Sequence, residues 1–188
     1  MRSARLPRCV LAIGAAALVF VAAGGTAHAS EGVKHVGVQG GFAGVSGGDG
    51  KFPGFGGAIT GRYDFTDAWS IALNATGTNN QVAATGGRSW VFSQAVGAVY
   101  SLDVIQIVPY LGGYVGVYEI TGGGVPKTDL KLGAQIAVGL DWMVSRDLTL
   151  GVELREHILP KDLFDSGTNP TPFYTTTFVK AEYAWGWF

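Results

Sequence analysis

The sequence is poor in charged residues and in cysteine. Charged side chains make up 14% of the 188 residues, against roughly 25% in soluble domains. The single cysteine, Cys9, excludes a disulfide framework and a zinc site built from several cysteines. The formal net charge is -1, so the chain lacks the basic surface that nucleic-acid binding requires. We therefore expect no nucleic-acid partner.

Glycine and apolar residues are abundant instead. Glycine occupies 30 positions, about twice the usual ~7% share, but without the strict three-residue period of collagen. Hydrophobic residues make up 47% of the chain and aromatic residues 12%, which is far too apolar for a disordered protein. The composition therefore predicts a folded chain.

The first 29 residues have the pattern of a secretory signal peptide. Three arginines precede an apolar run from Leu11 to Ala23. Ala27 and Ala29 are the small residues that a signal peptidase reads, so we expect cleavage after Ala29. The apolar run is short for a membrane-spanning helix, which needs ~20 residues. The predicted organisation is a signal peptide over 1–29 and one domain over 30–188.

The domain shows hydrophobic alternation with a period of two residues, which predicts β-strands. In one segment Leu132, Ile136 and Leu140 share one face, while Gln135 and Asp141 share the other. Eight segments show this pattern: 34–45, 54–65, 69–78, 88–102, 107–120, 131–144, 148–159 and 173–187. Most are as long as a tilted membrane strand, which needs ~9–11 residues, and longer than a typical globular strand of about 5–6.

The connections between these segments alternate in length. Long connections cover 46–53, 79–87, 121–130 and 160–172, and short ones cover 66–68, 103–106 and 145–147. The long ones are rich in Gly, Asn, Asp, Thr and Pro, as turns and loops require. Long loops at one end and tight turns at the other are typical of an outer-membrane barrel. An even number of strands places both termini at the tight-turn, periplasmic end.

Aromatic residues gather where such a barrel meets the two membrane surfaces. The predicted girdle consists of Tyr63, Trp69, Trp90, Tyr100, Trp142, Trp185 and Trp187. All but Trp90 lie beside short turns or the C-terminus, and Trp90 lies beside a long loop. Aromatic rings are favoured at both membrane interfaces. Alternation alone does not distinguish inside from outside, so a soluble barrel with an apolar interior remains the alternative.

Several short motifs resemble the small eight-stranded outer-membrane barrels of the OmpA-like superfamily. They are the turn from Tyr63 to Trp69, the strand start from Val108 to Tyr114, and the hairpin containing Gly139–Trp142 and Gly151–Arg155. The resemblance covers residues 30–188. It implies an all-β, transmembrane, antiparallel up-and-down barrel in the outer membrane of a Gram-negative cell envelope, with porin-like architecture.

The same resemblance implies that the barrel-insertion machinery recognises the C-terminal residue, Phe188. This signal departs from the family pattern, because the outward face of the last strand runs through Trp185 and Trp187, which leaves Phe188 one step out of register. The chain does not continue into a peptidoglycan-binding domain, so a tethering role is not implied.

The predicted interior of the barrel is polar. Alternation places seven charged residues there: Arg62, Asp64, Asp141, Glu153, Arg155, Lys180 and Glu182. An eight-stranded barrel is only just wide enough for side chains, and buried charges must be paired to avoid a cost of several kcal/mol each. Glycines on the same face make room for the large side chains. These residues either fill the lumen as a structural plug or line a gated ion path, and both readings stay open.

Gln94 does not fit the expected pattern. It faces lipid in the middle of its strand if Trp90 and Phe92 do. A bulge, or the opposite phase for segment 88–102, would resolve the conflict, and the sequence does not decide between them.

A catalytic role has little support in the sequence. A lipid-modifying barrel needs a nucleophile and a base within hydrogen-bond reach near the outer rim. His157 lies at the right height, but no serine accompanies it at strand spacing, and its neighbour Glu156 points to the opposite face. Asp162 and Asp165 supply too few oxygens for Ca²⁺, which takes six to eight. We expect no enzyme activity, no cofactor and no metal.

The sequence thus predicts an integral outer-membrane barrel with a structural or surface-interaction role and a side-chain-filled lumen. A narrow channel for small or hydrophobic solutes is the alternative, and a lipid-modifying enzyme a more distant one. The expected partners are outer-membrane lipid and the insertion machinery. The sequence does not identify a surface partner, because outer loops carry specificity and diverge freely. Eight strands do not require an oligomer, so a monomer is expected.

Overall fold

In a computed structural model, the chain forms eight antiparallel β-strands. The structure describes residues 31–47, 50–81, 87–102, 106–122, 129–159 and 173–186. The strands are β1 (Lys34–Gly47), β2 (Gly50–Asp64), β3 (Trp69–Gln81), β4 (Arg88–Ser101), β5 (Ile107–Gly122), β6 (Asp129–Met143), β7 (Leu148–Ile158) and β8 (Phe173–Trp185). The expected signal residues Ala27 and Ala29, and the C-terminal Trp187 and Phe188, lie outside the described residues.

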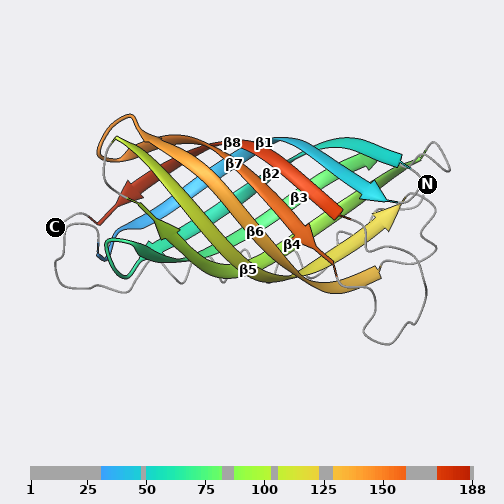
Figure 1. Cartoon of the computed structure of the whole chain (residues 1–188), viewed down its shortest axis with the longest axis horizontal. Coiled ribbons are helices and arrows are strands. Elements are labelled where there is room, and N and C mark those ends of the chain that lie inside the picture. The colour runs from blue at the N-terminus through green and yellow to red at the C-terminus, as the bar shows by residue number, and fades with distance from the viewer. Residues whose placement is uncertain are drawn as a thin grey trace, which may run out of the picture.

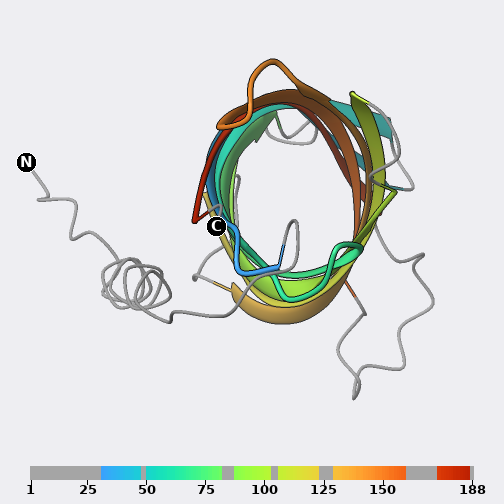
Figure 2. The ribbon, with the colours of Figure 1, turned by 90° about the vertical axis from the view of Figure 1, so that its left-hand side faces the viewer.

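Each strand pairs with its neighbours in the sequence, and β8 pairs with β1 to close the barrel. The closing ladder runs from Lys34 opposite Trp185 to Ser46 opposite Phe173. Figure 2 views the molecule from its left-hand end in Figure 1 and shows the strands as a complete ring. The expected all-β, eight-stranded up-and-down barrel is therefore confirmed. Among the described residues, no helix has the length and apolar character to cross a membrane.

Two tight turns at one end of the barrel share one construction. After β2, the hydroxyl of Thr66 accepts a hydrogen bond from the backbone N–H of Trp69 at 2.9 Å. After β6, the hydroxyl of Ser145 accepts one from Leu148 at 3.1 Å. Such hydroxyl-to-backbone bonds are the mechanism by which Ser and Thr favour turns. The end of β8 lies beside these turns (Figure 1), as the even strand number predicts.

The two faces of the strands have opposite character, and this decides which side faces the membrane. Large apolar side chains point outward and are exposed, for example Ile59 at 62% and Leu132 at 73%. Charged side chains point inward and are buried, for example Arg155 at 1%. A soluble barrel would show the reverse, because burying apolar surface is its main source of stability. The soluble alternative is therefore excluded for this arrangement.

The strands agree with the predicted segments to within one or two residues at the tight-turn end. At the other end, five of them extend further: β1, β2, β3, β5 and β6. The segments 34–45 and 54–65 continue as β1 and β2 until only two residues separate them, with Ser46 opposite Lys51. The expected long loop over 46–53 is therefore largely paired strand. Outside the hydrocarbon, strands can pair through their backbones without alternating apolar side chains. The alternating pattern therefore shows which part of each strand lies in the membrane, and it does not show where the strand ends.

The structure resolves the two alternatives for Gln94. The β4 ladders run without a bulge, with Gln94 opposite Ala75 on β3 and Val117 on β5. Its neighbours Ser93 and Ala95 are buried in the lumen, whereas Gln94 itself is half-buried on the outer surface. Trp90, Phe92 and Gln94 therefore all face outward, and Gln94 is a polar side chain on the membrane-facing wall.

Candidate functional site: the polar lumen

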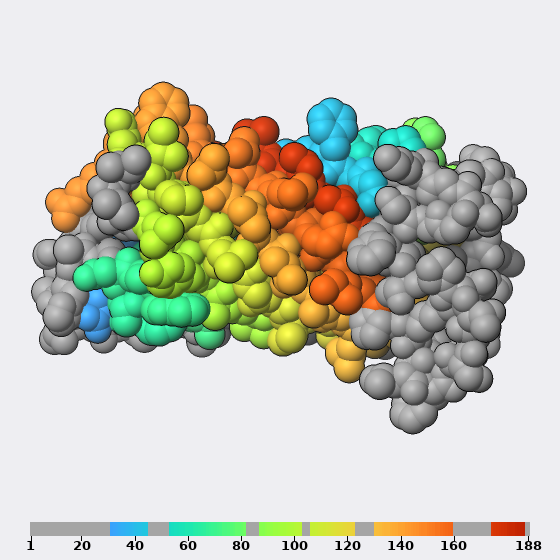
Figure 3. All heavy atoms as spheres, viewed as in Figure 1, coloured from blue at the N-terminus to red at the C-terminus, as the bar shows by residue number. Residues whose placement is uncertain are grey.

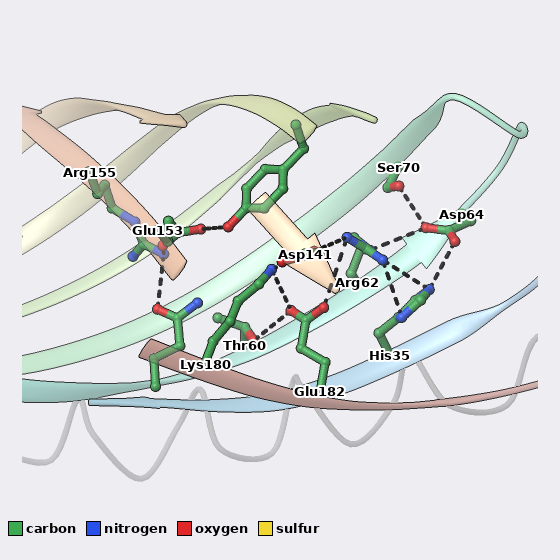
Figure 4. Close-up of polar contacts among 12 residues, drawn as sticks. His35, Thr60, Arg62, Asp64, Ser70, Asp141, Glu153, Arg155, Lys180 and Glu182 are labelled. Carbon is green, nitrogen blue, oxygen red and sulfur yellow. Dashed lines mark hydrogen bonds and ion pairs between the residues drawn. The ribbon is translucent and has the colours of Figure 1, made fainter. Parts of the chain in front are cut away.

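The lumen gathers all seven of the predicted charged residues. They come from four strands: Arg62 and Asp64 from β2, Asp141 from β6, Glu153 and Arg155 from β7, and Lys180 and Glu182 from β8. Their contacts form one cluster near the tight turns and a second cluster in the middle of the barrel (Figure 4). Four carboxylates thus meet three permanent cations, and a histidine adjoins the group.

That histidine, His35 on β1, joins Asp64 and Arg62 at the tight-turn end. His35 Nε2 lies 2.9 Å from Asp64 Oδ2, and Arg62 Nη2 lies 3.2 Å from His35 Nδ1. An imidazole protonated at Nε2 alone meets both contacts, because it donates to the carboxylate and accepts from the guanidinium. Ser70 donates to the other oxygen of Asp64 at 2.6 Å. Asp64 is therefore held from three sides.

Deeper in the lumen, Lys180 joins the carboxylates of β6 and β8. Its Nζ lies 2.9 Å from Asp141 Oδ2 and 3.4 Å from Glu182 Oε1. Arg62 contributes a second positive charge, with Nη1 at 3.8 Å from Asp141 and 3.9 Å from Glu182. The ammonium also lies 4.2 Å from the ring centre of Tyr110, a cation–π distance. Two cations and two carboxylates therefore neutralise one another across the lumen.

A second pair, Arg155 and Glu153, fills the middle of the barrel. The Arg155 guanidinium contacts Glu153 on the same strand and donates to Thr76 at 3.3 Å and Gln39 at 3.4 Å. Tyr110 donates its hydroxyl hydrogen to Glu153 at 2.8 Å. Arg155 therefore ties β7 to β1, two strands away, and crosses the lumen to β3 on the opposite wall.

Above this layer, toward the long-loop end, the lumen is closed by rings. The Tyr118 hydroxyl is hydrogen-bonded to His157 Nδ1 at 2.9 Å, and the Thr176 hydroxyl is hydrogen-bonded to His157 Nε2 at 3.2 Å. The His157 ring also lies 4.4 Å, centre to centre, from the ring of Tyr174. Tyr174 in turn contacts the Thr78 hydroxyl at 2.5 Å. This layer is neutral and tightly bonded, in contrast to the charged layers below it.

Sequence reasoning missed the luminal tyrosines Tyr110, Tyr114 and Tyr118. The sequence does indicate their direction. In β5 they lie an even number of residues from the inward Val108, and Val115 points to the other face, outward. Aromatic residues in a membrane barrel are also favoured at the interfaces, so the residue type alone does not indicate that a ring lies in the lumen. The tyrosines nevertheless supply much of the bulk that fills it.

Glycines on neighbouring strands make the space for these rings. A Cβ atom on Gly139 of β6 would overlap the ring of Tyr110, and one on Gly97 of β4 would overlap the ring of Tyr114. Larger residues at these positions would push the rings off their rotamers. The glycine content of the sequence is thus partly a packing requirement of the lumen.

Little free space remains inside. The cavity beside Arg62, Asn74 and Glu182 has a volume of about 20 Å³, which is room for about one water molecule. A second hollow of about 60 Å³ opens at the tight-turn end and is lined by His35, Asp141 and neighbouring residues. Among the described residues, no group of three or more His, Cys, Asp or Glu side chains is arranged to hold a metal ion. Asp162 and Asp165 lie outside the described residues.

The described girdle aromatics lie on the outer surface. At the tight-turn end Trp69 and Tyr100 are cross-strand partners with ring centres 5.0 Å apart. Trp142, Tyr63 and Trp185 lie at the same ends of their strands. Trp90 lies at the opposite end and stacks on Phe92 at 6.0 Å. Aromatic side chains thus flank the apolar band on both sides along β4, where Trp90 and Tyr100 bound it.

Comparisons with known proteins agree with this geometry. The Neisserial surface protein A structure matches with a TM-score of 0.67 and 18% identity, covering 81% of this chain and 99% of that one. Ail, the attachment invasion locus protein of Yersinia pestis, matches with a TM-score of 0.54 and 15% identity, covering 82% and 99%. The outer membrane enzyme PagL matches with a TM-score of 0.53 and 14% identity, covering 79% and 97%. At these identities the likeness is one of fold.

The sequence comparisons give the family. A comparison with curated protein sequences finds no match. The family model described as "Outer membrane protein beta-barrel domain" matches residues 13–183, which is most of the chain. This chain therefore belongs to the outer membrane protein beta-barrel domain family and is a small barrel of the OmpA-like type, located in the outer membrane.

Proposed function

We propose that this outer-membrane barrel has a structural or surface-interaction role and that its lumen is closed to solutes. The main support for the proposal is that side chains fill the cross-section of the barrel interior. Arg155 on β7 contacts Thr76 on β3, and Arg62 on β2 contacts Asp141 on β6. Each contact joins strands four positions apart in the closed ring, so both cross the interior. The cavity of about 20 Å³ beside them is too small for a hydrated ion.

The energetics favour a lumen that stays closed. Separating a buried ion pair leaves uncompensated charges and costs about 3–5 kcal/mol. A path past Lys180 would require breaking its contacts with Asp141 and Glu182, and a path past Arg155 would require moving a side chain that is 1% exposed. Opening both layers together would be rare on this basis.

With the interior closed, the activity would lie on the exterior. The strands β1 and β2 stay paired up to Gly47 and Gly50, beyond the predicted segments, so the barrel offers a rigid base for contacts outside the membrane. The names of two proteins that share the fold, a surface protein and an attachment protein, are consistent with a role in surface contact.

A narrow channel is the second candidate, and one observation favours it. Arg62 lies 3.4 to 3.9 Å from three different carboxylates, those of Asp64, Asp141 and Glu182. None of these distances is as short as the 2.7–2.9 Å of a strong charge-assisted hydrogen bond. A guanidinium shared in this way can exchange partners at low cost, as a gate requires.

Catalysis forms no part of the proposal. His157 is 0% exposed, and both of its ring nitrogens are engaged by hydroxyl groups. Glu156 lies on the outer face, where Thr175 donates to it at 2.5 Å. These two residues therefore do not share a site. Because the fold is shared with the enzyme PagL, the direct check is lipid analysis of cells with His157→Gln, which should match cells with the unaltered protein; an altered lipid profile would argue for an enzyme.

Conductance decides between the closed barrel and the channel. The full chain is expressed in a Gram-negative host, purified from its outer membrane and placed in a planar bilayer. A folded barrel, recognised by its heat-sensitive gel mobility, should give no conductance steps. Tyr114→Ala, which removes a ring from the middle of the lumen, serves as a positive control. Stable steps from the unaltered protein would establish the channel, and Arg62→Ala should then change its ion selectivity.

A further inference from the structure

Gln94 presents a polar amide to the hydrocarbon part of the membrane. It is the seventh of the 14 residues of β4 and lies between Trp90 and Tyr100, which mark the two interfaces. Along the strand it is roughly 13 Å from the first and roughly 20 Å from the second, at about 3.3 Å per residue. Water does not reach this depth, so the amide must find its hydrogen bonds in protein.

The barrel itself does not supply them. The cross-strand neighbours of Gln94 are Ala75 and Val117, and the outward residues on either side of it in β4 are Phe92 and Val96. None of these has a polar side chain. Glu119 on β5, the outward residue opposite Phe92, is the polar residue diagonal to Gln94. No hydrogen bond joins the Gln94 side chain to Glu119 or to another described residue. An amide left unpaired in an apolar medium costs roughly 2–7 kcal/mol.

The wall beside Gln94 is also hollowed. A depression of about 500 Å³ lies over β5, β6 and the end of β7, lined by Val115, Val117, Leu132, Ala134 and Ile158. Figure 3 looks onto this part of the molecule, where these strands cross the face in view. Val117 lies directly opposite Gln94, so the hollow and the amide form one continuous surface. We call these six residues the Gln94 face.

We propose that the Gln94 face is the contact between two copies of this chain in the membrane. Lipid acyl chains can fill the hollow, but they offer no donor or acceptor for the amide. A second copy does, because it lies in the same orientation and brings its own Gln94 to the same depth. Two primary amides are self-complementary, since each donates one N–H and accepts one at its carbonyl oxygen, and a two-fold contact places like residues together.

Disulfide trapping in the native membrane tests this contact. The full chain carries Cys9→Ser to remove its only cysteine, and one cysteine is then added by Val117→Cys. The matched control is Val179→Cys on β8, an equally apolar outward position four strands from β4. An oxidant that enters the bilayer should trap dimers of twice the chain mass at position 117, with at least about tenfold less at position 179.

Adding Gln94→Leu to the Val117→Cys chain should then lower the trapped dimer about tenfold, the equivalent of about 1.4 kcal/mol. Gln94→Asn keeps the amide and should retain most of it. Heat-sensitive gel mobility, measured on every variant, establishes that the barrel is folded. Equal trapping at both positions, no trapping at position 117, or dimers that persist with Gln94→Leu would each overturn the proposal, as would trapping of a different protein in place of a second copy.

Discussion

Lys180 on β8 and Asp141 on β6 meet across the lumen with 2.9 Å between Nζ and Oδ2, although the strand between them, β7, pairs with both. The contact therefore spans the curve of the barrel wall. Side-chain contacts in the lumen therefore join strands that are not adjacent in the sheet, as well as strands that are.

Replacing Lys180 with methionine should destabilise the barrel by about 3–5 kcal/mol, because it leaves Asp141 and Glu182 buried without their nearest cation. Urea unfolding in lipid vesicles, followed by tryptophan fluorescence, measures the loss. The double variant Lys180→Met with Asp141→Asn should recover part of it, because the unpaired charge is then removed. If the single variant were as stable as the original, the pair would contribute nothing to the fold.

Gly139→Ala should destabilise the barrel by about 1–3 kcal/mol, because the added methyl group takes the place of the Tyr110 ring and displaces its bond to Glu153. Gly113→Ala is the matched control, since a Cβ atom there meets nothing within 4 Å. The same unfolding measurement compares them. Equal effects of the two substitutions would show that space for the ring is not the reason for Gly139.

Tyr118→Phe should cost about 1–2 kcal/mol, because it leaves Nδ1 of the buried His157 without its hydrogen-bond partner. Tyr183→Phe removes the same hydroxyl group from an outward, 53% exposed position and should change the stability much less. The difference between their unfolding free energies isolates the luminal hydrogen bond. A larger loss for Tyr183→Phe would contradict the assigned orientation of the two faces.

Arginine substitutions on the outer face of β7 should report membrane depth. Val152→Arg lies in the middle of the strand and should cost about 2–4 kcal/mol, whereas Leu148→Arg lies beside the tight turn and should cost about 0–1 kcal/mol. Both residues are exposed and on the same face, so depth is the main difference between them. Folding free energies in vesicles provide the comparison, and equal costs would mean that Leu148 lies as deep in the membrane as Val152.

The sequence was a good guide to the wall of the barrel and a partial guide to its contents. The alternation of Leu132, Ile136 and Leu140 with Gln135 and Asp141 predicted strand, face and phase together, because a pleated strand places every second side chain on the same side. The strands β1 and β2 reach Gly47 and Gly50, beyond the ends of the predicted segments. Paired backbone outside the hydrocarbon carries no apolar pattern to be read.

The individual luminal contacts could not be predicted. Alternation places Lys180, Glu182, Asp141 and Arg62 on the inner face, but the pairing between them depends on how the closed wall curves. The luminal position of the tyrosines was not predicted for a different reason. A ring that anchors at an interface and a ring that fills a lumen have the same residue type, and only the phase within the strand separates them.

Closure of the barrel and completion of its charge network are a single event. The final strand brings both Lys180 and Glu182 and, by pairing with β1, sets them against the residues of β2 and β6. In a chain in which only the first seven strands have formed, Asp141 lacks its partner Lys180, and Arg62 lacks its partner Glu182. The last strand therefore both closes the barrel and supplies the charges that complete the luminal ion pairs. A barrel in which β8 does not pair with β1 lacks these ion pairs as well as the last ladder of backbone hydrogen bonds.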